Sequence, residues 1–241
     1  MKYVNQKDYP HWLYVTKTDL EEPLCTKGKT TTVASSACGL CSAVMVADRL
    51  LVNSNFELKD AIDLAYATKA NYSNGTSYQR FAPAFAEKLG FEWEGTNDPE
   101  RLRYCLRTGG AAVIHIGGDR EGHIGVFSHG GHYVAAIAED RDGRIVILDP
   151  SYAEGKYEEE GRKGLVELKN RVMAICDMQV LVAQDMLGMN EWVPKLAKKY
   201  ADLRTAILDA YNTYVKECNE RSFPDFDHQY NTNIEGIENL K

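Results

Sequence analysis

The spacing of the apolar residues changes near residue 110, and this change constrains the fold more than any other feature of the sequence. Up to Arg107 they recur at intervals of three and four residues, which is typical of amphipathic helices. From Ala111 onwards they gather in short runs rich in valine and isoleucine, which are typical of strands. Helices followed by strands, rather than the two in alternation, predict an α+β fold with a mostly antiparallel sheet.

Four helices are expected before residue 110. The first begins near Cys38, after a capping zone at Ser35 and Ser36, and its apolar stripe extends from Leu40 to Leu51. The other three are expected to begin after Asn55, near Thr76, and at Asn97 or Asp98 with Pro99 in the first turn.

Three strands are expected at 111–116, 133–138 and 144–148, and a further one or two within 163–183, most clearly at Met178–Ala183. Turn-forming residues at 140–143 join the second and third strands into a hairpin about Arg141. In such a hairpin, residue 132 lies opposite a position between 149 and 151, on the same side of the sheet. The sequence therefore brings His132 close to Asp149.

The C-terminal part follows a helical pattern again, with apolar residues every three to four positions through 191–220. Residues 221–241 are polar and without period. We expect a core domain at 1–187 and, at 188–241, a helical extension and tail that is too short to be an independent domain.

Composition excludes several classes of protein. The 241 residues are 44% hydrophobic and 26% charged, which suits a globular core rather than a disordered chain. A net charge of −7 argues against a nucleic-acid-binding or anionic-membrane-binding surface. No apolar run is long enough to span a membrane, and the polar start of the chain lacks a signal peptide, so we expect a cytoplasmic protein.

Two residues stand where nucleophilic chemistry would need them. Cys38 begins a helix, so the helix dipole and free backbone N–H groups can stabilise a thiolate there. His132 can act as its base, and Asp149 opposite it can fix the tautomer and stabilise the imidazolium. The alternatives are a buried packing cysteine, a surface histidine and an aspartate that serves only the Asp-Pro turn.

Two other chemistries remain open. Cys38 and Cys41 form a Cys-x-x-Cys pair that could be redox-active, although no βαβ unit surrounds it. His123, His129 and His132 lie close in sequence, but their spacing matches no known metal-ligand pattern. We expect neither a metal nor a cofactor.

Four motifs, in order, resemble the stand-alone papain-like cysteine peptidases related to the bacteriocin-leader (double-glycine) peptidase family. They are Tyr3-Val4-Asn5-Gln6-Lys7-Asp8, the run from Ser36 to Val46 that contains Cys38, Gly131-His132-Tyr133-Val134, and Asp149-Pro150. The resemblance covers about 1–185. The sequence departs from the family pattern at Ala37, where the family has Gly, and at Leu40-Cys41, where it has Pro-Thr.

This resemblance implies a papain-like fold, with Cys38 on a helical half and His132 and Asp149 on a sheet half. Cys38 would be the nucleophile, His132 the general base and acid, Asp149 the group that orients the histidine, and Gln6 an oxyanion donor. The implied function is a bacterial thiol hydrolase that cleaves a peptide or protein substrate through a thioester. An amidase or acyltransferase on the same triad, or a catalytically silent peptide-binding module, stays open, as does a homo-oligomer formed through the C-terminal helices.

Overall fold

A computed structural model describes residues 1–16, 31–51, 54–72, 75–120, 124–170, 172–178, 180–181, 203–220 and 222–223 of the chain. The chain divides into two compact units, Met1–Ala183 and Gln184–Lys241. Their boundary lies a few residues before the predicted one, between 187 and 188. Each unit is described by itself.

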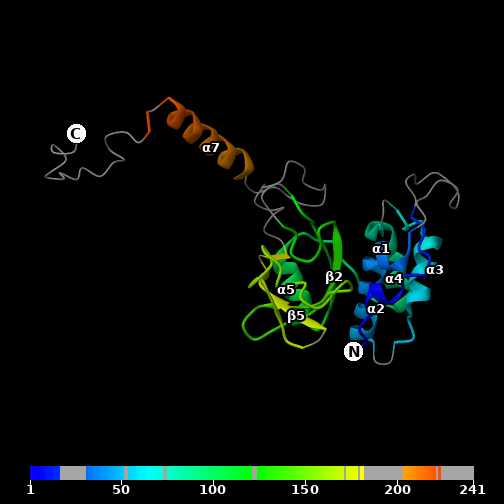
Figure 1. Cartoon of the computed structure of the whole chain (residues 1–241). Helices are drawn as coiled ribbons and strands as arrows, with labels where there is room; N and C mark the ends of the chain where they lie inside the picture. The colour runs from blue at the N-terminus through cyan, green and yellow to red at the C-terminus, as the bar shows by residue number, and fades with distance from the viewer. Residues whose placement is uncertain are drawn as a thin grey trace, which may run out of the picture. The chain divides into compact units, whose positions relative to one another are not determined.

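The first unit has helices before strands (Figure 1). A 3-10 helix, η1 (Gln6–Asp8), precedes α1 (Val33–Ser36), α2 (Cys38–Leu50), α3 (Leu58–Ala67), α4 (Tyr78–Leu89) and α5 (Pro99–Arg107). The strands are β1 (Ala112–Ile116), β2 (His132–Glu139), β3 (Ile145–Leu148), β4 (Val166–Leu168) and β5 (Met173–Cys176). They form one sheet in the order β1-β2-β3-β5-β4, and every neighbouring pair is antiparallel.

The predicted hairpin is present. Ala135 pairs with Leu148 and Ala136 with Ile147, and continuing this register places His132 opposite Ser151, within the predicted range. The predicted helix at Cys38 is also confirmed, since α2 begins at that residue.

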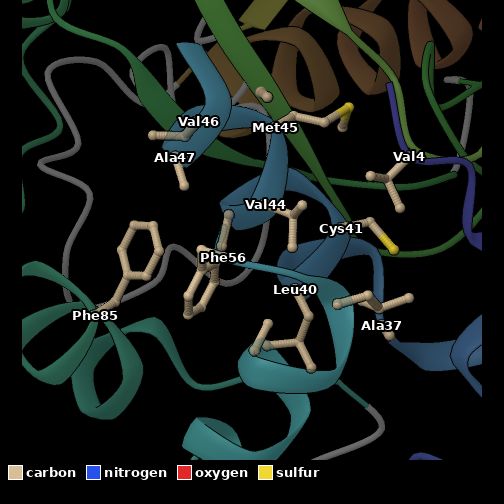
Figure 2. Close-up of a cluster of buried hydrophobic side chains, with 14 of the residues drawn as sticks. Val4, Ala37, Leu40, Cys41, Val44, Met45, Val46, Ala47, Phe56 and Phe85 are labelled. Carbon is tan, nitrogen blue, oxygen red and sulfur yellow. The ribbon is translucent and has the colours of Figure 1, made fainter. Parts of the chain in front are cut away.

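Alternate residues of β2 and β3 supply two separate hydrophobic clusters, as the two-residue period of strands requires. Ala135 and Leu148 pack with α2 in the first cluster, while Val134 and Ile147 belong to the second. Figure 2 shows α2 in the first cluster, with Leu40, Cys41 and Val44 among the labelled side chains. Each fully buried aliphatic side chain of this kind contributes about 1.5–3 kcal/mol, so α2, and with it Cys38, is firmly fixed against the sheet.

The predicted strand at Met178–Ala183 is wrong for its described part. β5 ends at Cys176, and Met178, Val180 and Leu181 are helical. The register explains why: residue 178 would have to pair with Gly143 or Gly164, and both glycines have a positive φ that belongs to turns. The strand therefore stops where its partners on both sides turn away.

In the second unit, the structure describes α7 (Leu203–Asn219), which lies within the predicted helical segment 191–220. Residues 191–202 and the predicted polar tail after 223 lie outside the described residues. None of the described helices has the length and hydrophobicity needed to cross a lipid bilayer.

Candidate functional site

Cys38 is the first residue of α2 and is partly exposed. Its sulfur interacts with the side chain of His132 and with the backbone at Gly39 and Tyr133. Burial raises the pKa of the thiol, but the hydrogen bond and charge of His132, helped by these two backbone groups, outweigh burial and bring the pKa below its ordinary value. The site therefore favours a thiolate.

His132 begins β2 and lies between Cys38 and Asp149. Its Nε2 is 2.8 Å from Oδ1 of Asp149, which leaves Nδ1 as the ring nitrogen that faces the sulfur. Burial lowers the pKa of His132, but its bonds to Asp149 and Cys38 outweigh this and raise the pKa to about 9. At neutral pH the imidazole is therefore protonated, and its positive charge favours the thiolate form of Cys38.

Asp149 follows β3 and is almost completely buried, with 1% of its surface exposed. Five donors bind its carboxylate: His132 Nε2, the N–H and Oγ of Ser151, Lys156 Nζ and Tyr157 OH. Burial opposes ionisation, but the hydrogen bond and charge of His132 and the charge of Lys156 hold the pKa of Asp149 well below its usual range. It is a permanent carboxylate.

Gln6 is buried, and it lies beside α1, the short helix that precedes Cys38. Its Nε2 donates to the carbonyl of Ala34 at 2.7 Å, and its backbone N–H donates to the carbonyl of Pro150 at 2.7 Å. One side-chain amide hydrogen of Gln6 therefore binds α1 rather than Cys38. The predicted oxyanion role of Gln6 stays a prediction.

Tyrosine rings enclose the start of α2. Tyr78 donates its OH to the carbonyl of Gly39 at 2.6 Å, and its ring lies 4.8 Å from that of Tyr133. A Cβ on Gly39 would come within 3.0 Å of the Tyr78 ring and 3.2 Å of the Tyr133 ring, so only glycine fits there without movement. The glycine after Cys38 therefore lets aromatic rings pack directly over the first turn.

The other predicted candidates are not brought into this arrangement. Cys41 is fully buried, and its burial and the nearby charge of Cys38 raise its thiol pKa, which is opposite to a redox-active partner. His129 pairs with Asp119 rather than with His132, and His123 lies outside the described residues. Among the described residues, no three His, Cys, Asp or Glu side chains form a group able to hold a metal ion.

Sequence analysis did not identify three further residues that bind the carboxylate of Asp149. Ser151, Lys156 and Tyr157 belong to a stretch of consecutive turns from 151 to 165, which has no periodic pattern to indicate burial. Lys156 is only 9% exposed, although lysines are rarely buried. The only available signal was their closeness in sequence to the Asp-Pro step.

Comparison with known proteins gives a different family from the one predicted. A family model of ketopantoate hydroxymethyltransferase matches residues 173–226. A 3-methyl-2-oxobutanoate hydroxymethyltransferase from Caulobacter vibrioides is 30% identical over 169 residues, 64% of this chain and 58% of that protein. Proteins of the same name from Hyphomonas neptunium and Francisella tularensis are 43% identical over 63 residues (26% of this chain, 23% of that protein) and 53% identical over 55 residues (22% and 21%). No solved structure matches the chain.

The chain thus spans between about a fifth and three fifths of the length of these relatives. β5 opens the matched segment 173–226 and pairs with β3 and β4, so the segment includes part of the first unit's sheet. Its remainder includes α7 of the second unit.

These findings contradict the predicted papain-like cysteine peptidase. The relatives are hydroxymethyltransferases, so the predictions of a thiol hydrolase, of an amidase or acyltransferase on the same triad and of a silent peptide-binding module are wrong. The four motifs behind that prediction are short and lie outside 173–226. A few residues in the right order identify a local arrangement, and such arrangements recur on unrelated proteins.

Proposed function

We propose that the protein is an enzyme that transfers a hydroxymethyl group to a 2-oxo acid of the 3-methyl-2-oxobutanoate type. The observation that carries this proposal is the match of 173–226 to the ketopantoate hydroxymethyltransferase family. The 30% identity over 169 residues to the Caulobacter vibrioides protein of that activity supports it. Within the first unit, the matched strand β5 is hydrogen-bonded to β3, the strand that leads directly to Asp149.

The reaction for which the relatives are named specifies which bond would form. A hydroxymethyl group is a one-carbon unit at the oxidation level of formaldehyde, and its acceptor is the carbon next to the keto group. A base removes the proton on that carbon, the resulting enolate carbon attacks the one-carbon unit, and the new alkoxide takes up a proton. The reaction therefore needs a group that accepts and returns one proton near neutral pH.

The Cys38–His132 pair supports this acid–base role. The sulfur and the imidazole shift each other's pKa, and Asp149 keeps the imidazole in place through a 2.8 Å hydrogen bond. Because Cys38 is partly exposed while Asp149 is buried, a substrate would approach from the sulfur side. In this proposal the pair takes the proton from the carbon acid and returns it to the alkoxide.

Proton removal can be tested without any one-carbon donor. The full-length protein is incubated with 3-methyl-2-oxobutanoate in D2O, and 1H NMR follows the signal of the hydrogen on C3. We expect that signal to disappear faster than in buffer alone, and its adjacent methyl doublet to collapse to a singlet. Cys38→Ser and His132→Gln should abolish the enzymatic exchange, whereas His129→Gln, in an exposed pair on a neighbouring loop, should retain it.

Formaldehyde is then added as the simplest one-carbon source, and the hydroxymethylated product is sought by NMR and mass spectrometry. Exchange at the rate of the buffer blank, together with no product, would overturn the proposed function. Exchange that persists unchanged in Cys38→Ser and His132→Gln would keep the function but remove the acid–base role of this site.

A further inference from the structure

Lys156 forms a buried ion pair that the acid–base chemistry of Cys38 and His132 does not itself require. Its Nζ lies 2.5 Å from Oδ2 of Asp149, and the side chains are 9% and 1% exposed. The same ammonium donates to Oγ of Ser151 at 2.8 Å and to the Ser151 carbonyl at 3.3 Å. All three ammonium hydrogens therefore have an acceptor around Asp149.

The two oxygens of Asp149 serve two different cations. Oδ1 binds His132 at 2.8 Å, while Oδ2 binds Lys156 at 2.5 Å and accepts the hydroxyl of Tyr157 at 2.7 Å. Ser151 lies between them, because its Oγ is 3.1 Å from His132 Nε2 and 2.8 Å from Lys156 Nζ. The imidazole and the ammonium thus share one carboxylate in an almost completely buried site.

We propose that Lys156 is a positioning residue that controls how tightly His132 holds its proton, by dividing the carboxylate of Asp149 between two cations. This inference does not depend on the proposed function, because it concerns the ionisation of the free protein. Positive charge on Lys156 repels the imidazolium and draws the negative charge of Asp149 towards Oδ2. Lys156 thereby weakens the hold of His132 on its proton and keeps that proton transferable.

Other titratable groups surround this cluster and, apart from Tyr157 in the variant that replaces it, stay the same in every comparison below. Burial and the positive charges of Arg162 and Lys7 lower the pKa of Lys156, against the opposing effect of Asp149. Tyr3 donates its hydroxyl to the backbone carbonyl of Asp149 at 2.6 Å. The remaining groups are Cys38 and Cys41 on α2, Tyr78 on α4, Tyr133 on β2, His115 on β1, Tyr157 and Glu159 in the turn segment, and Asp8 in η1.

The test is a direct titration of His132 in the full-length protein. Histidine labelled with 13C at the ring is incorporated, and the His132 signal is identified by its loss in His132→Gln. In Lys156→Gln, which keeps a donor but removes the charge, we expect the His132 midpoint to rise by about one pH unit. Lys156→Arg keeps the charge and should stay close to the native midpoint. Tyr157→Phe removes only a neutral donor and should produce a smaller rise.

Lys163→Gln is the matched control, because Lys163 lies in the same turn segment but is exposed. It should leave the His132 midpoint unchanged. A folded Lys156→Gln protein with an unchanged or lowered midpoint would overturn the proposal and leave Lys156 a purely structural residue. If Lys156→Gln does not fold, the same criterion applies to Lys156→Met, which keeps the length of the side chain. No substrate enters this titration, so its failure is distinguishable from failure of hydroxymethyl transfer.

Discussion

Among the residues that the structure describes, two histidine–aspartate pairs have nearly the same length and opposite environments. His132 and Asp149 are 2.8 Å apart with side chains 4% and 1% exposed, while His129 and Asp119 are 2.7 Å apart and 68% and 42% exposed. Water screens the charges of the second pair, so its Coulomb energy is small. Forming this exposed pair also costs side-chain entropy. The comparison shows that the two pairs differ in burial rather than in the length of the contact.

The neighbours of the two aspartates differ in the same sense. Asp149 has five donors that include a buried ammonium, whereas Asp119 accepts from the N–H of Gly125 and from His129. The buried Arg162 lies between the two pairs. Its Nη2 is 3.3 Å from Nε2 of His129, and its Nη1 is 3.5 Å from the carbonyl oxygen of Lys156. One loop surface and one buried site are therefore joined through a single guanidinium.

The largest difference should appear in stability. Asp149→Asn removes the counter-charge of the buried Lys156 ammonium and one of the two negative groups beside the His132 imidazolium, and breaking a buried pair in this way costs about 3–5 kcal/mol. Urea unfolding of the full-length protein at pH 6 measures the loss. Asp119→Asn is the matched variant and should leave the unfolding midpoint where it is. Equal losses in the two variants would show that burial does not separate the pairs.

Thiol reactivity should separate the two histidines next. An ordinary thiol, with a pKa near 8.5, is mostly protonated at pH 6, so His132→Gln should slow alkylation of Cys38 by about 100-fold at that pH. Iodoacetamide labelling, with each of the six cysteines quantified by mass spectrometry, measures this. His129→Gln should leave the rate unchanged. If Cys38 reacts no faster than Cys41 in the native protein, the thiolate–imidazolium pair does not exist.

The elements that bring Cys38, His132 and Asp149 together were predictable because they depend on short-range patterns. The apolar stripe from Leu40 onwards indicates α2, and the turn at 140–143 fixes the register that brings position 132 opposite 149–151. The strand predicted at Met178–Ala183 failed because the partners of residue 178 would be Gly143 and Gly164, far away in sequence. No local pattern reveals where a strand's neighbours end.

The rest of the site was not predictable for a related reason. Lys156 and Tyr157 become buried only because the turns from 151 to 165 cover the end of the sheet, and irregular backbone has no period that marks its inner face. The family prediction failed at another level. Cysteine, histidine and aspartate in order describe a reactive arrangement, whereas the match to the hydroxymethyltransferase family model covers 173–226, where none of these residues lies.

The dependence of stability on pH should reveal the coupling of Cys38 and His132. His132, raised from 6.5 to about 9, contributes stability that is complete below pH 6.5 and is lost as the pH rises to about 9. Cys38, lowered from 9.0, contributes stability that is complete above pH 9 and is lost as the pH falls. Between pH 6.5 and 9 the two trends oppose each other, because His132 gains a proton on folding where Cys38 loses one.

Urea unfolding of the native protein at pH 6.5, 7.5 and 8.5 should therefore show a smaller slope than His132 alone would give. Cys38→Ser removes one of the two trends, so stability should fall above pH 6.5 by up to about 1.4 kcal/mol per pH unit. His129→Gln should retain the profile of the native protein. A Cys38→Ser protein with the native profile would mean that folding does not change the pKa of the Cys38 thiol.

The smallest effect should come from two serines that serve the two pairs. Ser151 donates its Oγ hydroxyl to Oδ1 of Asp149 at 3.1 Å and accepts from Lys156, while Ser128 accepts only the N–H of Gly130, at 3.3 Å, in the exposed loop. Ser151→Ala should cost about 1 kcal/mol because three charged groups, Asp149, Lys156 and His132, each lose a partner that water cannot readily replace. Ser128→Ala should cost less, since water can reach Gly130. Urea unfolding at pH 7 compares the two variants, and a larger loss in Ser128→Ala would contradict the view that burial gives these short contacts their energetic weight.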